Sequence, residues 1–257
     1  MQRVAALYDI HGNLPALEAV LEDVRREGVD AIVVGGDVLP GPMPRECLDL
    51  LHSTGIRTEF IHGNGESAVL ESLRGGELTA VPEAFRDGIR WNGTQIPNER
   101  VAAISAWPLT ARFEIDGMGN VLFCHATPRN DTEIFTKLSS PERIWVMFAG
   151  VNAAIVVCGH THMQFDLTVD VLRIVNAGSV GAPFANPGAY WALFGPDVQL
   201  RRTSYDVEAA ASRIRRTDFP GAARFADSVV LPHPESAMLS FYAKVDGRVR
   251  ADNETAG

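Results

Sequence analysis

The stretch RVAALYDIHGN, residues 3–13, decides the fold of this 257-residue chain. Its first half, RVAALY, is a short apolar run of the length and composition of a buried strand. The loop DIHGN follows, and beyond it apolar residues recur at intervals of three and four, as in an amphipathic helix: Leu14, Leu17, Leu21 and Val24. Asn13 is expected to cap this helix, Pro15 suits its first turn, and Gly28 ends it. The stretch therefore predicts a strand, a polar loop and a helix.

The same alternation continues along the chain. AIVVGGD, 31–37, predicts a second strand buried on both faces, followed by a helix within 41–55, and RTEFIHGN, 57–64, predicts a third strand. The weakly helical pattern of about 66–108 indicates an insertion or cap region. Beyond it we expect a hairpin within 111–126, a short helix near 140–149, a strand opening 154–162, further strands near 164–169, 171–176, 189–195 and 198–204, and a helix capped by Asp206.

The chain is expected to form one α/β domain over residues 1–257, because no repeat, linker or low-complexity tract divides it. After Pro220 the pattern weakens, so we treat 220–257 as a C-terminal extension. We expect the segment 228–242 either to pack back on the domain or to contact a second copy, and its apolar stretch around Ala237 to Tyr242 makes a homo-oligomer one of the two alternatives.

The composition of the chain indicates which classes of binding partner to expect. The chain has 32 acidic and 23 basic residues, a net charge of −9, which disfavours a stable nucleic-acid partner. No apolar stretch reaches the roughly 18 to 20 residues that span a bilayer, so no membrane partner is expected. The three cysteines have unrelated spacings that make no disulfide framework, and no signal peptide precedes the first strand. These features predict a cytoplasmic protein.

Polar side chains follow the predicted strands at the points where the strands end: Asp9, His11, Asp37, Asn64, His125, His160 and His162. In an open α/β sheet, the carboxyl ends of the strands meet at one edge, where ligands bind. Imidazole and carboxylate groups suit Mn, Fe, Zn and similar ions. Seven candidates are more than one ion needs, so we expect two, bridged by a carboxylate and a hydroxide. Asp37, alone after its strand, is the predicted bridging ligand.

Five ordered motifs resemble the calcineurin-like metallophosphoesterase family: DIHGN at 9–13, GGD at 35–37, GN at 63–64, CH at 124–125 and GHTH at 159–162. NAGSVGAP at 176–183 is similar to the bacterial phosphodiesterase-type branch of that family. The resemblance implies a four-layer α/β/β/α sandwich of two mixed sheets flanked by helices. It implies a first ion on Asp9, His11, Asp37 and His162, and a second on Asp37, Asn64, His125 and His160. It also implies that Asn13 contacts the substrate phosphate.

The function implied is a dinuclear metal-dependent phosphoesterase that uses two divalent ions, Mn, Fe, Zn or a mixture. Phosphodiester hydrolysis by a metal-bridging hydroxide is the first choice, with catalytic roles for Asp37, Asn64, His125 and Asn13. The alternatives are a dinucleoside polyphosphate hydrolase of the diadenosine tetraphosphatase type and a phosphomonoesterase. A noncatalytic scaffold with the same fold is an alternative of another class, which the presence of all seven ligand residues disfavours. The expected partner is a small phosphoester or nucleotide substrate.

Two positions outside the ligand set bear on the substrate. Many relatives carry a histidine directly after the asparagine of the GN motif, where it assists the leaving group, but this chain has Gly65. Without that acid, good leaving groups are expected to be favoured unless Glu66 or another residue substitutes. Arg129, a few residues beyond His125, is a candidate for binding the substrate phosphate, with a loop-stabilising role as the equally weighted alternative.

Overall fold

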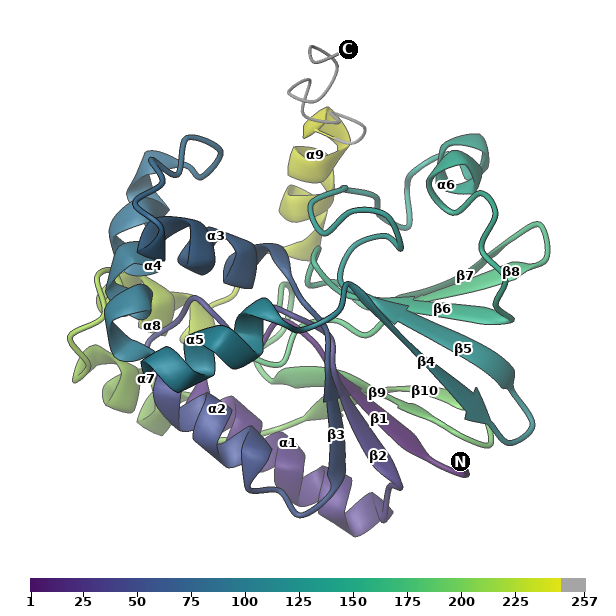
Figure 1. The fold of residues 1–257 in the computed structure, drawn as a ribbon, viewed down its shortest axis with the longest axis horizontal. Helices are drawn as coiled ribbons and strands as arrows, with labels where there is room; N and C mark the ends of the chain where they lie inside the picture. Colours follow the sequence, from purple (N-terminus) through teal and green to yellow (C-terminus); the bar gives the residue numbers. More distant parts are fainter. Residues whose placement is uncertain (246–257) are drawn as a thin grey trace.

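The computed structural model, which describes residues 1–245, consists of two five-stranded sheets packed face to face (Figure 1). The first sheet has the order β10 (Val198–Thr203), β9 (Ala189–Phe194), β1 (Val4–Leu7), β2 (Ala31–Val34) and β3 (Arg57–Phe60). The second has the order β4 (Thr110–Ile115), β5 (Gly119–Cys124), β6 (Ile155–Cys158), β8 (Leu172–Asn176) and β7 (Phe165–Val169). Both sheets are mixed, as predicted.

Both sheets combine parallel and antiparallel pairs of strands. In the first sheet β1, β2 and β3 are parallel to one another and β3 forms an edge, while β9 pairs antiparallel with β1 and β10 pairs antiparallel with β9. In the second sheet β5, β6 and β8 are parallel, while β4 and β7 pair antiparallel with their neighbours. The central parallel strands β1, β2 and β6 are buried throughout and have the continuous apolar sequence that strands covered on both faces need, whereas the edge strand β3 is only partly buried.

Alternating side chains of β1 show how the layers are built. Val4 and Ala6 belong to the core between the two sheets, where they meet the second sheet's Phe123 and Val157 among others. Ala5 and Leu7 face the opposite side and join the core beneath the helices. The outer face of the second sheet has its own smaller core. The four-layer α/β/β/α arrangement expected from the sequence is confirmed.

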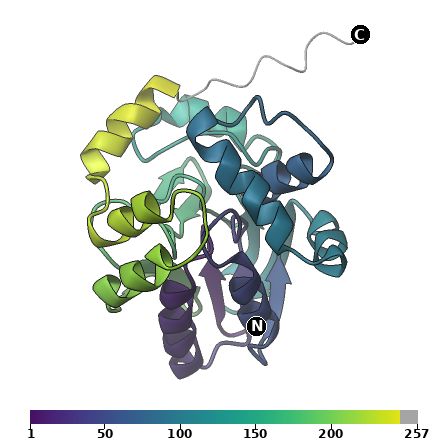
Figure 2. The same ribbon diagram turned by 90° about the vertical axis from the view of Figure 1, so that its left-hand side faces the viewer.

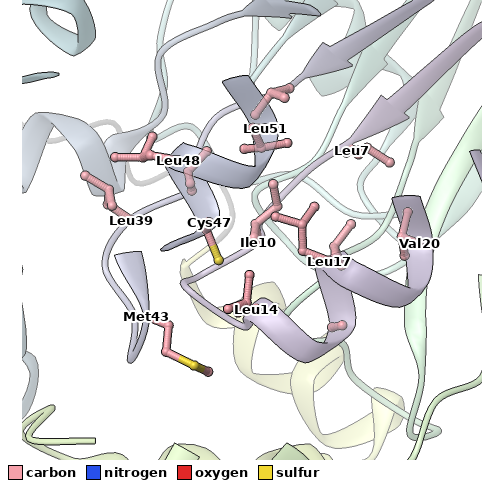
Figure 3. Packing of buried hydrophobic residues seen from close by; sticks show 14 of the residues in the cluster. Leu7, Ile10, Leu14, Leu17, Val20, Leu39, Met43, Cys47, Leu48 and Leu51 are labelled. Carbon is pink, nitrogen blue, oxygen red and sulfur yellow. The ribbon is translucent and has the colours of Figure 1, made fainter. Parts of the chain in front are cut away.

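Most helices cover the first sheet (Figures 1 and 2). Its helical core includes buried residues of α1 (Leu14–Glu27), α2 (Pro44–His52), α3 (Asn64–Leu73), α4 (Glu83–Gln95), α5 (Asn98–Ser105), α7 (Val207–Arg215) and α8 (Ala222–Val230). Figure 3 shows the part of this core around α1 and α2. The second sheet is covered by α6 (Pro141–Met147), whose Ile144 and Met147 enter the third core. The helix α9 (Glu235–Val245) buries none of its residues. No helix within residues 1–245 is both long and apolar enough to cross a membrane.

The weakly helical region near 66–108 forms α3, α4 and α5. Its buried Val69, Ile89 and Ile104 join the same core as α1 and α2, so this region extends the helical layer of the first sheet. In the predicted extension 220–257 the structure shows α8 and α9, and residues 246–257 lie outside the described part of the chain.

Candidate metal centre

The predicted ligands come from the carboxyl ends of strands in both sheets. Asp9, Asp37 and Asn64 follow β1, β2 and β3 of the first sheet, whereas His125 follows β5 and both histidines of GHTH follow β6 of the second. The sequence predicted that these side chains meet at one edge of a single sheet. In the structure they meet where the carboxyl ends of strands from two sheets come together. Side chains from opposite sheets can face one another there, which one edge would not allow.

One group of side chains gathers around Asp9. His11 Nε2 lies 3.1 Å from His162 Nε2, and His162 Nε2 lies 3.4 Å from Asp9 Oδ1. Ligand atoms of these three residues all lie within 4.8 Å of one another, close enough to share one ion. These are three of the four residues that the resemblance gives to the first ion, and they come from the loops after β1 and β6, with His11 and His162 separated by 151 residues in the sequence.

A second group gathers around Asp37. His125 Nε2 lies 3.5 Å from Asp37 Oδ1 and 3.9 Å from Asp9 Oδ1, and ligand atoms of these three residues lie within 4.8 Å of one another. His125 Nε2 is also 3.0 Å from Asn64 Oδ1. The other oxygen of Asp37, Oδ2, faces His11 Nε2 at 3.8 Å. Asp37 thus presents one oxygen to each group, which is the arrangement that a bridging ligand needs.

Three of the histidines are oriented by the backbone. Nδ1 of His11 is 3.2 Å from the Pro40 carbonyl, Nδ1 of His125 is 2.9 Å from the Gly35 carbonyl, and Nδ1 of His162 is 2.7 Å from the Ala182 carbonyl. A carbonyl can only accept, so each Nδ1 carries the hydrogen and donates it. Each Nε2 is left with a lone pair aimed into the cluster, which is how proteins usually hold metal-binding histidines.

This donor set fits a bound cation. The Nε2 lone pairs of His11 and His162 face each other at 3.1 Å, which is unfavourable unless a positive charge lies between them. Asp9 Oδ1 and His160 Nε2 are buried and have no hydrogen-bond partner among the described residues. An unsatisfied buried carboxylate oxygen costs free energy, about 1 to 3 kcal/mol for a polar group and more for a charged one. Divalent ions coordinated by these atoms would remove that cost.

The backbone of the ligand loops is strained. Asp9, His11, Asp37, His160 and His162 all adopt left-handed φ angles, between 46° and 65°. Residues with a Cβ rarely adopt this conformation, although Asp and His tolerate it better than most. These backbone angles cost free energy, and they aim five side chains into one cluster. Strained residues of this kind are common at functional sites.

The buried charges shift pKa values within the cluster. Burial alone would raise the pKa of Asp9, but the nearby His162, whose Nε2 lies 3.4 Å from Asp9 Oδ1 and is charged when protonated, holds the pKa of that carboxyl well below its usual range. Burial lowers the pKa of His160 to about 3, and His125 beside it adds to this shift. Asp9 is therefore an anion and His160 a neutral imidazole near neutral pH, the forms that coordinate metal ions.

His160 and His162 face different neighbours. The His162 ring lies beside His11, with centroids 4.9 Å apart, whereas the His160 ring lies beside His125, with centroids 5.1 Å apart. The backbone N–H of His160 also donates to Asp9 Oδ2 at 2.9 Å, which ties the two sheets together at the ligands. The two histidines of GHTH therefore have different ring neighbours, and that each serves a different ion stays a prediction.

Gly65 is explained by the loop that follows β2. A Cβ at this position would lie 2.0 Å from the backbone oxygen of Leu39 and 2.9 Å from Asp37 Oδ1. The N–H of Gly65 donates to Asp37 Oδ1 at 2.6 Å, so the close approach also holds the predicted bridging ligand. The histidine found in many relatives has no space here, because the obstructing atom is backbone.

Glu66 has a structural role beside this glycine. Its carboxylate is fully buried and accepts hydrogen bonds from the backbone N–H groups of Asp37, Leu39 and Gly63, at 2.8, 3.1 and 2.9 Å. Burial, and then the nearby Asp37, raise the pKa of Glu66 to about 8, while the backbone hydrogen bonds oppose that shift. Glu66 thus joins the loops after β2 and β3, and it has no route to an exposed leaving group.

Asn13, which was expected to contact the substrate phosphate, has hydrogen-bond partners within the protein. The Asn13 amide is buried: its oxygen caps α1 by accepting from Ala16 N at 3.3 Å, and its nitrogen donates to Gly181 O at 2.8 Å and Tyr205 Oη at 3.3 Å. Both of its N–H hydrogens are therefore used within the protein. The substrate contact expected from the resemblance has no free donor at Asn13 in this structure.

Arg129 shows the loop-stabilising contacts of its alternative role. Its guanidinium forms a forked pair with the buried Glu133, with its closest contact at 2.6 Å, and Thr127 donates to the same carboxylate. These residues close the loop between His125 and α6. A phosphate would have to compete with Glu133 for this side chain.

The structure also joins three residues that sequence reasoning left unassigned. Ser67 on α3 donates to Asp131 Oδ2 at 2.7 Å and lies 3.2 Å from Nδ1 of His62. His62 stands two residues before Asn64, and Asp131 lies in the loop after His125. No sequence spacing signals this contact, since it links two loops that meet only in the folded chain.

Comparison with known proteins agrees with this geometry. The calcineurin-like phosphoesterase superfamily domain matches residues 2–196, which contain all the predicted ligands, and the chain belongs to this family. An uncharacterized protein of Methanocaldococcus jannaschii, MJ0912, is 29% identical over 237 residues, covering 84% of this chain and 93% of the relative.

Two solved structures share the fold over most of their length. The metallophosphoesterase from Sphaerobacter thermophilus is 26% identical, with a TM-score of 0.68, covering 89% of this chain and 98% of that one. The hypothetical protein PH1004 from Pyrococcus horikoshii has a TM-score of 0.75 at 20% identity, covering 90% and 98%. The family match and the Sphaerobacter metallophosphoesterase suggest phosphoester hydrolysis, while PH1004 shows the shared fold.

Proposed function

We propose that this protein is a dinuclear metal-dependent phosphoesterase whose default reaction is phosphodiester hydrolysis. The observation that carries the proposal is the meeting of two buried carboxylates with Nε2 atoms whose Nδ1–H groups are held by backbone carbonyls. Groups buried without partners at this point, Asp9 Oδ1 and His160 Nε2, suit cations better than solvent.

The ligand residues divide into two sets around Asp37. Asp9, His11 and His162 would hold one ion with Asp37, and Asn64, His125 and His160 would hold the other with Asp37. Divalent ions bound there would place positive charge at the phosphoryl oxygens and lower the pKa of the attacking water. The protein holds the ligand atoms in position in three ways. The ligand loops have a strained backbone, carbonyl groups accept from Nδ1 of three histidines, and the Glu66 carboxylate joins the loops after β2 and β3.

The direct test is a substrate screen of the Mn²⁺-loaded protein. We expect bis(4-nitrophenyl) phosphate to be cleaved faster than 4-nitrophenyl phosphate and diadenosine tetraphosphate. Preference for the dinucleoside polyphosphate or for the monoester would select one of the two alternatives in the same class. Absence of hydrolysis with all three, in protein shown to contain metal, would favour the noncatalytic scaffold.

Metal binding should be visible as stability. A ligand at 100 times its dissociation constant adds about 2.7 kcal/mol to the free energy of unfolding. At about 2 to 4 °C per kcal/mol for a chain of this size, Mn²⁺ should raise the melting temperature by roughly 5 to 10 °C for each site. Differential scanning calorimetry with Mn²⁺, and then with excess chelator, measures this effect. An unchanged melting temperature with Mn²⁺ would contradict a metal site built from these residues.

The absence of a side chain at Gly65 predicts a steep dependence on the leaving group. No histidine can stand there to protonate a departing oxygen, and the carboxylate of Glu66 is enclosed. For a series of phenyl methyl phosphodiesters, we expect kcat/KM to fall by more than tenfold as the phenol pKa rises from about 7 to about 10. A flat dependence across the series would show that another group supplies the proton.

A further inference from the structure

The helix α9 projects from the domain, as Figure 1 shows, and two polar contacts hold the chain near the start of this helix. The backbone N–H of Ala185 donates to the His233 carbonyl at 2.9 Å, just before the helix begins. Lys137 Nζ lies 2.6 Å from Glu235 Oε1 in the first turn. None of the residues of α9 is fully buried, so packing against a core does not explain its position.

Both attachment points belong to loops that carry the metal centre. Lys137 lies in the loop that begins at His125, and Ala185 lies in the loop whose Ala182 carbonyl accepts a hydrogen bond from His162. The helix therefore connects two segments that orient ligands from the second sheet. This connection fixes its position relative to the site although it contributes little to the core.

A row of rings leads from the metal centre to α9. Phe184 stacks on His162 with centroids 5.4 Å apart and planes at 20°, and the Tyr242 ring follows, with its centroid 6.5 Å from that of Phe184. Tyr242 is partly buried on this side, whereas its neighbour Phe241 is 54% exposed. Of these two adjacent aromatic residues, Tyr242 is the one whose ring neighbours Phe184, and through Phe184 it is linked to His162.

The negative charge of Asp9 acts on the phenol of Tyr242. Burial, and then the negative charge of Asp9, raise the pKa of Tyr242 above its ordinary range. The hydroxyl therefore keeps its proton at all working pH values, and a protonated phenol is a neutral hydrogen-bond donor. It can contact an anion without the desolvation cost of a second charge.

Three positions from which the sequence predicted help for the substrate offer no free side-chain donor among residues 1–245. The amide of Asn13 donates within the protein, the guanidinium of Arg129 is paired with Glu133, and Gly65 has no side chain. We propose that α9 presents Tyr242 to the substrate, and that the phenol hydroxyl donates a hydrogen bond to a phosphoryl oxygen of the bound phosphoester. This inference rests on the proposed phosphoesterase function and names a residue that binds its substrate.

The test compares Tyr242→Phe with the wild type in two measurements on the full-length, Mn²⁺-loaded protein. The first is calorimetric titration with inorganic phosphate, which requires no turnover. The second is KM and kcat for bis(4-nitrophenyl) phosphate. Tyr190→Phe is the matched control, because its hydroxyl donates to the Asn186 carbonyl at 3.2 Å on the exposed surface. Metal content is determined for all three proteins.

For Tyr242→Phe we expect phosphate to bind about tenfold more weakly, the size of a lost hydrogen bond to a charged group. Metal content should be unchanged, and Tyr190→Phe should bind phosphate like the wild type. Equal phosphate affinity of Tyr242→Phe and wild type would overturn the assignment. Weaker binding accompanied by loss of metal would also overturn it, because the residue would then support the metal site. If wild type binds phosphate but hydrolyses no ester, the proposed function fails while the role of Tyr242 is still decided by the titration.

Discussion

Asp37→Asn is expected to reduce kcat/KM for phosphoester hydrolysis at least about a hundredfold, which corresponds to about 2.7 kcal/mol of transition-state stabilisation. Asp37 presents Oδ2 toward His11 and Oδ1 toward His125, so each group of ligands lies beside a different oxygen of this residue. Asparagine keeps the shape and can still accept from the N–H of Gly65, but it removes the negative charge and one of the two oxygens.

The fold should survive this substitution, since the buried charge next to Glu66 is removed and no packing is lost. The measurements are kcat/KM and metal content, with the melting temperature of the metal-free protein as a check on folding. Asp116→Asn, at an exposed turn between β4 and β5, is the matched control and should change none of them. An Asp37→Asn protein with wild-type activity and metal content would refute the bridging role.

Gly65→Ala is expected to destabilise the protein by about 3 kcal/mol, the upper part of the range for forcing atoms into a filled interior. The added Cβ would lie 2.0 Å from the Leu39 carbonyl oxygen, so the loop after β2 must move away. That loop also carries Asp37, whose Oδ1 accepts from the N–H of Gly65. The loss of stability should therefore be accompanied by weaker metal binding.

Gly93→Ala provides a matched control within a neighbouring helix. Its Cβ would approach Leu73 Cδ2 at 3.1 Å, and a side-chain methyl can turn aside where a carbonyl cannot. Alanine also suits a helix interior better than glycine, so its effect should stay within about 1 kcal/mol. Urea denaturation of both variants measures the difference. Equal stability of Gly65→Ala and wild type would mean that the loop adapts freely, and that a histidine could have been accommodated.

The sequence placed the candidate ligands after strands, and the structure brings most of them together at that point. Apolar runs such as AIVV mark β2 and β6, and residue types suited to metals follow within a few positions. The packing of two sheets was expected from the family resemblance, and strand order was not predicted, because local periodicity carries no information about which sheet a strand joins. That these residues bind metal stays a prediction.

The roles of Asn13 and Arg129 depended on partners that sequence spacing does not reveal. Gly181, which accepts from Asn13, lies 168 residues further along the chain. Glu133 is only four residues from Arg129, but an i, i+4 spacing predicts an ion pair only within a helix, and this segment is a loop. The left-handed conformation of Asp9 and His11 was equally hidden, since neither is a glycine.

Gly65 shows most clearly what the sequence alone does not reveal. The sequence shows only that this position lacks the histidine that many relatives carry. The structure shows what the position requires: the Leu39 carbonyl fills the space that a side chain would need. The leaving-group preference therefore follows from the packing of two loops as well as from the identity of one residue.

The central claim is that the carboxylates and histidines between the two sheets hold two metal ions. A crystal structure of the Mn²⁺-loaded protein, with anomalous diffraction data collected near the Mn absorption edge, tests it most directly. The claim predicts two anomalous peaks about 3.5 to 4 Å apart, with Asp37 between them, one peak beside His162 and the other beside His160. A single peak, or none at these residues, would contradict it.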